Sequence, residues 1–278
     1  MVPYVSDKDL YRFKLALILG NGNRLKKLLR RFPTEKKFKK AKSAEIADTI
    51  GISNSDSDII HKLDNIDDVF NEMVTFKPDK RWSKKPDASV IMGIDTEYLK
   101  SELDCIQYTV MEDLKIVDNG FIFTNNSLAP SITIKKGIDF LRDVINEYNP
   151  ELLVGHNFNS DISILENAYM RDIPELYYYD DTMNLMQWSN LSNIMGSSGL
   201  NKVVTNLFDL DVVDLFTAYD NLSLLIEYGM KDTIYPILIR HFILNREMPD
   251  LDYNFKINKV IKDENRSLLK RFEEGRQP

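Results

Sequence analysis

Four acidic residues in three short motifs carry the clearest chemistry of this chain. They are Asp95 and Glu97 in Gly-Ile-Asp-Thr-Glu-Tyr (93–98), Asp161 in Gly-His-Asn-Phe-Asn-Ser-Asp (155–161), and Asp232 in Tyr-Gly-Met-Lys-Asp (228–232). Each motif lies at the edge of an apolar stretch, where a carboxylate is unfavourable unless it is paired or binds a cation. Four acids that converge from separate elements repel one another, so an intervening metal is the simplest way to hold them together. Phosphodiester cleavage is the chemistry that this pattern favours.

The spacing inside the motifs predicts how the acids are presented. Asp95 and Glu97 are two residues apart in a predicted strand, so they share one face while Thr96 points to the other. Tyr228 and Asp232 are four residues apart in a predicted helix and stack on one face of it. Taken singly the motifs are weak, because Asp-x-Glu is common and an acid often lies at a helix start. Their combination and order carry the specificity.

Together, the three motifs resemble those of the DEDD superfamily of 3′–5′ exonucleases, which has a ribonuclease H-like fold. The spacing of Tyr228 and Asp232 is that of the tyrosine-bearing branch. The histidine-bearing branch would have a histidine where this chain has Glu227. The resemblance covers roughly residues 89–245 and does not extend to residues 1–87. Further positions that look common in these folds are Asp181-Thr182 and Leu200 to Val203.

The resemblance implies a two-metal-ion mechanism with Mg²⁺ or Mn²⁺, the hard cations that carboxylate oxygens suit. Asp95 would bridge both ions. Glu97 and Asp232 would hold the ion that activates water, and Asp161 would hold the ion at the leaving 3′-oxygen. Tyr228 would orient the attacking water, because an unperturbed phenol is a poor base near neutral pH.

Residues beside the motifs are candidates for contacts with substrate. They are Thr96, Tyr98, Asn157 and Phe158. Aromatic rings near the site could stack on terminal bases. Core packing explains Tyr98 and Phe158 at least as well, and Asn157 equally suits a turn. His156 fits a structural hydrogen-bond donor better than a catalytic group.

The apolar pattern predicts an α/β fold. We expect strands over 89–94, 105–111, 116–123 and 152–155 and from 177, with a hairpin turn at 112–115. We expect helices over 136–148, 160–170 and from 222 past 232. Three strands followed by alternating helices and strands indicate a mixed sheet covered by helices. A ribonuclease H-like sheet, which the resemblance implies, agrees with this expectation.

Changes in composition and in the spacing of apolar residues divide the chain into three parts. We expect a small basic helical region (1–87), an exonuclease domain of the tyrosine-bearing DEDD type (88–255) and a basic helical tail (256–278). Segment 43–53 has the spacing of a helix-turn-helix entry. The two aspartates that follow it would face phosphates, so an ordinary helical turn is the favoured interpretation.

Charge separates along the chain. The formal net charge is −7, yet residues 1–87 carry 19 Lys or Arg against 13 acids, and residues 88–255 carry 10 against 26. A solvated basic helix and an acidic, solubilising surface explain this about as well as basic arms that bring a polyanion to an acidic metal site. The stretch 24–42 could be a nucleic-acid-binding arm. Alternatively, residues 1–87 could dock a polymerase, replication or repair partner.

Composition narrows the function classes. The single cysteine, Cys105, excludes an intramolecular disulfide and a cysteine-based zinc site, and we expect it to be a buried small hydrophobe. The early aliphatic run 15–19 is too short for a membrane span and lacks a secretory pattern, so we expect a cytoplasmic protein with no membrane partner. The leading expectation is an enzyme that hydrolyses single-stranded or frayed 3′ ends, of DNA more than RNA. The alternative is a catalytically weak nucleic-acid-binding or replication/repair accessory module with an exonuclease-like fold.

Overall fold

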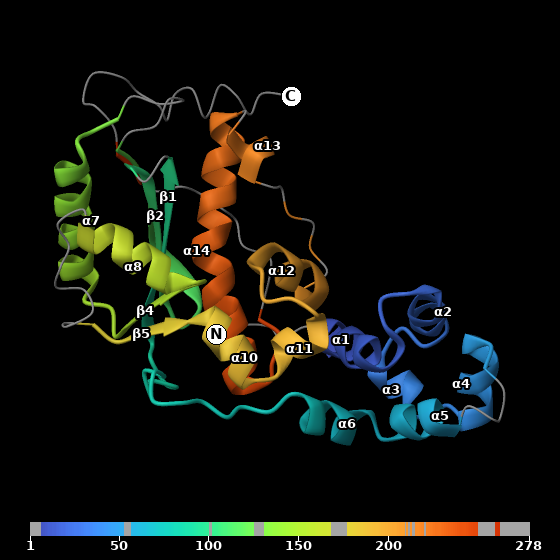
Figure 1. The fold of residues 1–278 in the computed structure, drawn as a ribbon. Helices are drawn as coiled ribbons and strands as arrows, with labels where there is room; N and C mark the ends of the chain where they lie inside the picture. The colour runs from blue at the N-terminus through green and yellow to red at the C-terminus, as the bar shows by residue number, and fades with distance from the viewer. Residues whose placement is uncertain are drawn as a thin grey trace.

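A six-stranded mixed sheet forms the centre of the protein. The computed structural model describes residues 7–52, 57–99, 102–124, 131–167, 177–208, 210, 212, 215–219, 221–249 and 259–261. The strand order is β5-β4-β1-β2-β3-β6. The strands are β1 (Val90–Leu99), β2 (Glu102–Glu112), β3 (Lys115–Phe123), β4 (Leu152–Gly155), β5 (Tyr179–Asp181) and β6 (Lys259–Ile261). Helices cover both faces of this sheet, so the predicted α/β class is confirmed (Figure 1).

The first three strands form an antiparallel meander. β1 pairs with β2, and β2 pairs with β3. The predicted hairpin lies between Glu112 and Lys115, where Asp113 and Leu114 have φ angles of 48° and 61°. Both residues are left-handed, as type I′ turns require, and that turn matches the twist of the flanking strands. Local turn chemistry therefore sets the register of β2 against β3.

Two parallel strands extend the sheet on the other side of β1. β4 pairs with β1 and β5 pairs with β4, both in parallel. The helix α7 (Ile134–Tyr148) precedes β4 and ends at the left-handed residue Asn149, next to Pro150. The helix α8 (Phe158–Asn167) follows β4 directly. Because β1, β4 and β5 run in the same direction, their carboxyl ends meet at one edge of the sheet, where ligands of open α/β sheets commonly bind.

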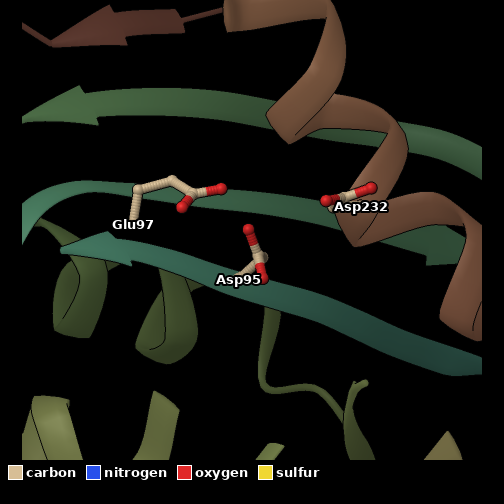
Figure 2. Close-up of side chains that lie close together, drawn as sticks. All are labelled: Asp95, Glu97 and Asp232. Carbon is tan, nitrogen blue, oxygen red and sulfur yellow. The ribbon is translucent and has the colours of Figure 1, made fainter. Parts of the chain in front are cut away.

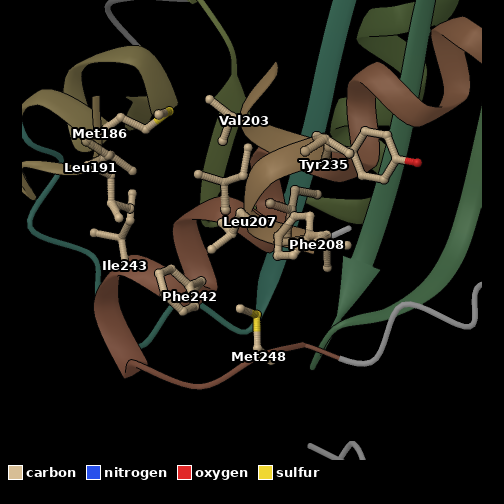
Figure 3. Packing of buried hydrophobic residues seen from close by; sticks show 14 of the residues in the cluster. Met186, Leu191, Val203, Leu207, Phe208, Tyr235, Phe242, Ile243 and Met248 are labelled. Atoms are coloured by element: carbon tan, nitrogen blue, oxygen red, sulfur yellow. The ribbon is translucent and has the colours of Figure 1, made fainter. Parts of the chain in front are cut away.

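The long helix α14 (Leu222–Asn245) covers the face of the sheet opposite α7 and α8 (Figure 1). Asn221 caps its first turn by accepting hydrogen bonds from the N–H groups of Ser223 and Leu224. The short helix α13 (Leu215–Tyr219) packs beside its start. Three further helices pack against its other side around Phe242 and Ile243 (Figure 3). They are α10 (Thr182–Trp188), α11 (Leu191–Met195) and α12 (Leu200–Phe208).

The helices before the sheet build a second, smaller hydrophobic core. They are α1 (Asp7–Leu19), α2 (Asn23–Arg31), α3 (Glu35–Phe38), α4 (Ser43–Ile50), α5 (Ser57–Asp64) and α6 (Ile66–Met73). Fully or nearly fully buried side chains such as Tyr11, Leu28 and Leu63 fill this core, which is separate from the clusters on the sheet. We call residues 7–73 the helical module.

The helical module is anchored on the sheet-bearing part by α1 and α6. Phe13 of α1 makes edge-to-face contacts with Phe70 of α6 and Phe242 of α14, with ring centroids 6.3 and 5.4 Å apart. The guanidinium of Arg12 donates to the carbonyl of Leu207 at the end of α12. A buried ion pair between Arg240 and Asp180 holds the connecting segment, because Arg240 also donates to the carbonyl of Lys85.

The structure departs from the sequence-based expectation in the tail. Residues 259–261 form β6, which pairs in parallel with β3, whereas we expected a helical tail over 256–278. β3 would otherwise be an edge strand with unpaired backbone groups, and pairing satisfies some of them. The other residues of the tail lie outside the described part. Among the helices that the structure describes, none is long and apolar enough to cross a membrane.

Candidate metal centre

Three of the four predicted carboxylates meet between β1 and α14. Asp95 and Glu97 extend from the same face of β1, and Asp232 reaches them from α14 (Figure 2). One oxygen from each residue lies within 4.8 Å of the others. Asp232 and Asp95 are 137 positions apart in the chain, so tertiary packing alone brings them together. The predicted sharing of a face by Asp95 and Glu97 is confirmed.

Small residues allow α14 to approach the sheet closely enough for this contact. A Cβ on Gly93 would lie 1.9 Å from the carbonyl oxygen of Thr233, so only glycine fits on β1 beneath the helix. A Cβ on Gly229 would lie 2.7 Å from the side chain of Gln107. The hydroxyls of Thr109 and Thr233 hydrogen-bond at 2.6 Å and fix the helix on β2. Asp232 is the neighbour of Thr233, so these contacts set its position.

Asp161 reaches the same edge from the opposite face of the sheet. It lies in the first turn of α8 and is buried. Its Oδ1 accepts hydrogen bonds from the N–H of Thr96 at 2.9 Å and from the Thr96 hydroxyl at 2.7 Å. Thr96 lies between Asp95 and Glu97, so the backbone of the first motif holds the acid of the second. Asp161 is outside the group of three, and its Oδ2 is the oxygen that it can offer to a cation.

A network at the end of β5 supports the second motif. The carboxylate of Asp181 accepts from the N–H of Asn157 at 3.0 Å and from the N–H of Met183 at 2.9 Å, which caps α10. Asn157 is left-handed, with φ 56°, and its side-chain amide donates to Ser160. His156 hydrogen-bonds through Nδ1 to the Thr182 hydroxyl at 2.8 Å. These contacts hold the turn from β4 into α8.

Burial and mutual repulsion make the carboxylates hard to ionise in the absence of a cation. Burial, followed by repulsion from its acidic neighbours, raises the pKa of Asp95 well above its usual value. The same two causes raise the pKa of Glu97 to about 8. Burial raises the pKa of Asp232 to about 7 and that of Asp161 to about 6, although hydrogen bonds partly oppose both shifts. A divalent cation would reverse this penalty.

The donor set fits a hard divalent cation. Asp95 Oδ2 is buried and accepts no hydrogen bond from the residues that the structure describes. An unsatisfied buried carboxylate oxygen is unfavourable, and a metal ligand bond would satisfy it. Asp95, Glu97 and Asp232 offer only carboxylate oxygen, which suits Mg²⁺ or Mn²⁺ better than softer metals.

Tyr228 lies one helical turn before Asp232, as the sequence predicted. Its hydroxyl donates a hydrogen bond to the Asp232 carboxylate, which lowers the pKa of Asp232 against the larger effect of burial. Burial, together with the nearby acids, raises the pKa of Tyr228 above its usual value. A cavity of about 10 Å³ adjoins Tyr228 and Asp232, and Asn201 of α12 also lines it. That volume is close to what one water molecule needs.

Comparison with known proteins does not place the chain in a family, because no family model and no curated protein matches it. The function of the chain is therefore inferred from its motifs and from the geometry of the site.

The structure places two of the four residues expected to contact substrate in exposed positions and the other two in internal contacts. Phe158 is fully buried against Gly155 and Tyr179, so it belongs to the core and the expectation of a substrate contact is corrected. The Thr96 hydroxyl is used by Asp161. Tyr98 has 53% of its surface exposed, and Asn157 is also exposed, so both remain candidates.

One acid near the site was missed by sequence reasoning. Asp104 is the extra residue where the β1–β2 register shifts, because Glu97 pairs with Cys105 and the next residue of β1 pairs with Leu103. Its buried carboxylate accepts a hydrogen bond from Tyr219 of α13 at 2.8 Å and contributes to the raised pKa of Glu97. A single aspartate inside an apolar strand was the available signal. Cys105 is buried, as predicted.

Proposed function

We propose that the protein is a metal-dependent 3′–5′ exonuclease of the tyrosine-bearing DEDD type with a ribonuclease H-like fold. The observation that carries the proposal is the meeting of Asp95, Glu97 and Asp232 within 4.8 Å at the carboxyl edge of a mixed sheet. The hydrogen bonds that join Asp161 to Thr96 bring the fourth acid to the same edge. The 3′–5′ direction follows from the resemblance of the motifs alone.

The order and direction of the strands support the fold proposal. An antiparallel meander is followed by two parallel strands, each reached through helices. The first acid pair lies on the central strand β1, and the other acids come from helices on its two faces. A mixed sheet arranged in this way allows three segments that are distant in sequence to converge on one phosphodiester group.

The chain's own residues would divide the work between binding and positioning. Asp95, Glu97 and Asp232 would hold Mg²⁺ or Mn²⁺, and Asp161 would offer its Oδ2 as a further ligand beside Asp95. When bound, such ions lower the pKa of a water molecule and neutralise charge on the leaving oxygen. Tyr228 would orient the attacking water from the small cavity beside it. Thr96 would keep Asp161 in place through both of its hydrogen bonds.

The test uses 5′-labelled linear single-stranded DNA, duplex DNA and RNA with Mg²⁺, Mn²⁺ or a chelator. We expect a metal-dependent ladder that shortens from the 3′ end, with single strands or frayed ends preferred. Asp95→Ala should abolish the ladder and keep the fold, because it removes repulsion together with a ligand. Persistent cleavage by a clean Asp95→Ala preparation would refute the site, and no cleavage by the unmodified chain would favour the binding-module alternative.

A further inference from the structure

The outer surface of the helical module carries a dense group of exposed cations. Residues 24–42 contain ten Lys or Arg and one acid, Glu35. All ten cations are exposed. They are Arg24, Lys26, Lys27, Arg30, Arg31, Lys36, Lys37, Lys39, Lys40 and Lys42. We call these residues the cationic surface.

Local structure explains why every cation points outward. In α2, Leu25 and Leu28 face the core of the module, so the basic positions between and beyond them face solvent. In α3, only Phe38 is buried, and Thr34 caps the helix by accepting from the N–H of Lys37. Seven of the ten cations lie in α2 or α3, which share one hydrophobic core, and Lys39, Lys40 and Lys42 lie in the segment between α3 and α4.

Most of these charges are not neutralised. Within the described part of the chain, only Arg31 and Lys39 of the ten form ion pairs. The other acids of the module lie mainly in α4 to α6, away in sequence from α2 and α3. The other eight exposed cations, all within residues 24–42, raise the local positive potential, which attracts polyanions over roughly a Debye length, about 8–10 Å at physiological salt.

Packed helices connect the cationic surface to the acidic centre. Phe13 of α1 packs on Phe242 of α14, and Asp232 lies ten residues earlier on the same helix. Ten residues of helix span about 15 Å. The module continues from there past α11 and α12, away from the sheet (Figure 1). A chain of phosphates could contact both places, whereas a mononucleotide in the acidic centre could not.

We propose that the cationic surface binds the phosphate backbone of the nucleic acid whose 3′ end is cleaved. The identity of this ligand rests on the proposed function. Backbone contacts of this kind supply affinity without reading sequence, so the surface would hold the substrate while successive 3′ nucleotides are removed. This assignment selects the nucleic-acid arm from the two roles that the sequence left open for residues 1–87.

The same placement argues against α5 as an element that reads DNA. The first turn of α5 carries the exposed Asp58, which pairs with Lys62 of the same helix. Asp64 at its end accepts a hydrogen bond from Ser43. An acidic helix would repel phosphates, so contact through α2 and α3 is favoured over a helix-turn-helix mode.

The test measures binding of the full chain, in a chelator that prevents cleavage, to a DNA dumbbell whose ends are closed by loops. The dumbbell has no 3′ end, so the acidic centre cannot act on it. Lys26→Gln/Lys27→Gln/Lys36→Gln removes three charges from the cationic surface. The matched control, Lys115→Gln/Lys135→Gln/Lys136→Gln, removes three exposed charges elsewhere. Closed circular single-stranded DNA and an RNA dumbbell serve as further probes and identify the preferred form.

We expect the triple variant at the cationic surface to bind the dumbbell about 10- to 100-fold more weakly at low salt, with the slope of log K against log salt reduced by about 2 to 3. The control should keep nearly the original slope. Equal losses in both variants, or no loss in either, would overturn the assignment. No binding of any probe by the unmodified chain would also overturn it and would leave protein docking as the use of this surface.

This test and the cleavage test fail separately. Intact 3′–5′ cleavage without salt-dependent dumbbell binding would refute the cationic surface alone. Dumbbell binding that depends on the cationic surface, without cleavage of any linear substrate, would refute the nuclease alone.

Discussion

Like charges lie in opposite environments in the acidic centre and on the cationic surface of the helical module. Asp95, Glu97 and Asp232 bring three carboxylates within 4.8 Å of one another, with Asp232 buried and the other two partly buried. On the cationic surface of the module the cations are exposed, and the partly exposed Asp67 pairs with Lys14 and Lys39. Buried repulsion is unfavourable unless a ligand relieves it, whereas exposed charges are hydrated at little cost. The clustered acids therefore indicate a ligand-binding site, whereas the exposed cations indicate a solvated surface.

The largest expected difference between the two regions is in how well each accommodates a methyl group added at a glycine. Gly93→Ala would place a Cβ 1.9 Å from the Thr233 carbonyl oxygen, so α14 must move. We expect the free energy of unfolding to fall by about 3 kcal/mol, with cleavage impaired because Asp232 is displaced. In the module, Gly22→Ala meets nothing within 4 Å and should change stability by less than about 0.5 kcal/mol. Denaturant titrations that give equal losses would contradict this contrast.

Removing a tyrosine hydroxyl should affect the cleavage rate in the acidic centre but only the stability in the helical module. Tyr228→Phe should lower kcat by about 100-fold with little change in stability, because it removes the hydroxyl that we propose orients the attacking water. In the module, Tyr11→Phe loses the hydrogen bond from its hydroxyl to the carbonyl of Phe32, 3.1 Å long. That variant should lose about 1 kcal/mol of stability and keep its kcat. Steady-state cleavage rates and thermal melts of both variants separate the two roles.

The pH dependence of stability should have opposite signs in the two regions. In chelator, burial and nearby acids raise the folded pKa of Glu97 to about 8, and burial raises that of Asp232 to about 7, each above its usual value of 4.5 or 3.8. The folded state therefore binds more protons between these limits, and stability falls as pH rises from about 4 to 8. Asp95→Asn should flatten this fall and stabilise the metal-free protein at pH 8, because the pKa of Asp95 is itself raised by burial and by its acidic neighbours. Added Mn²⁺ should restore the stability of the unmodified protein.

Asp67 in the module provides the reverse case. Burial opposes the shift, but hydrogen bonds from Lys14 and Lys39 lower the pKa of Asp67 below its usual value. Its contribution to stability is present above the unfolded pKa and is lost as pH falls through the folded pKa. Asp67→Asn should therefore destabilise the protein at neutral pH. Melting curves across pH that show the same sign for Asp67→Asn and Asp95→Asn would contradict the comparison.

The smallest effect concerns the link between the first two motifs. Thr96→Val keeps the backbone bond to Asp161 and removes the hydroxyl bond of 2.7 Å. We expect about a tenfold loss of metal affinity or activity, with Thr96→Ser close to the unmodified protein. Thr34→Val in the module removes the cap of α3 and should cost about 1 kcal/mol without changing cleavage. Titration with Mn²⁺ distinguishes them, and a loss of affinity in Thr34→Val would argue against separate roles.

Features that depend on short sequence distances were predictable. The two-residue spacing of Asp95 and Glu97 gave their common face, and the four-residue spacing of Tyr228 and Asp232 gave theirs. The hairpin followed from two turn residues between apolar runs. These features are local, and backbone periodicity determines them.

Features that depend on tertiary contacts were not predictable. Phe158 is buried because Gly155 has no side chain and leaves room for the ring, a pairing that composition does not reveal. Asp104 is the extra residue of β2 where the register of β1 and β2 shifts, and its charge contributes to the raised pKa of Glu97. β6 forms a strand through pairing with β3, more than a hundred residues earlier, which overrides local propensity.

The close docking of α14 on β1 also sets the order in which the centre assembles during synthesis. A ribosome adds about 5–20 residues per second, so about 7–30 s separate the appearance of Asp95 from that of Asp232, 137 residues later. Until α14 has emerged and settled over Gly93, the carboxylates of β1 lack their third partner. Before that point of its synthesis the nascent chain would therefore carry no assembled acidic centre.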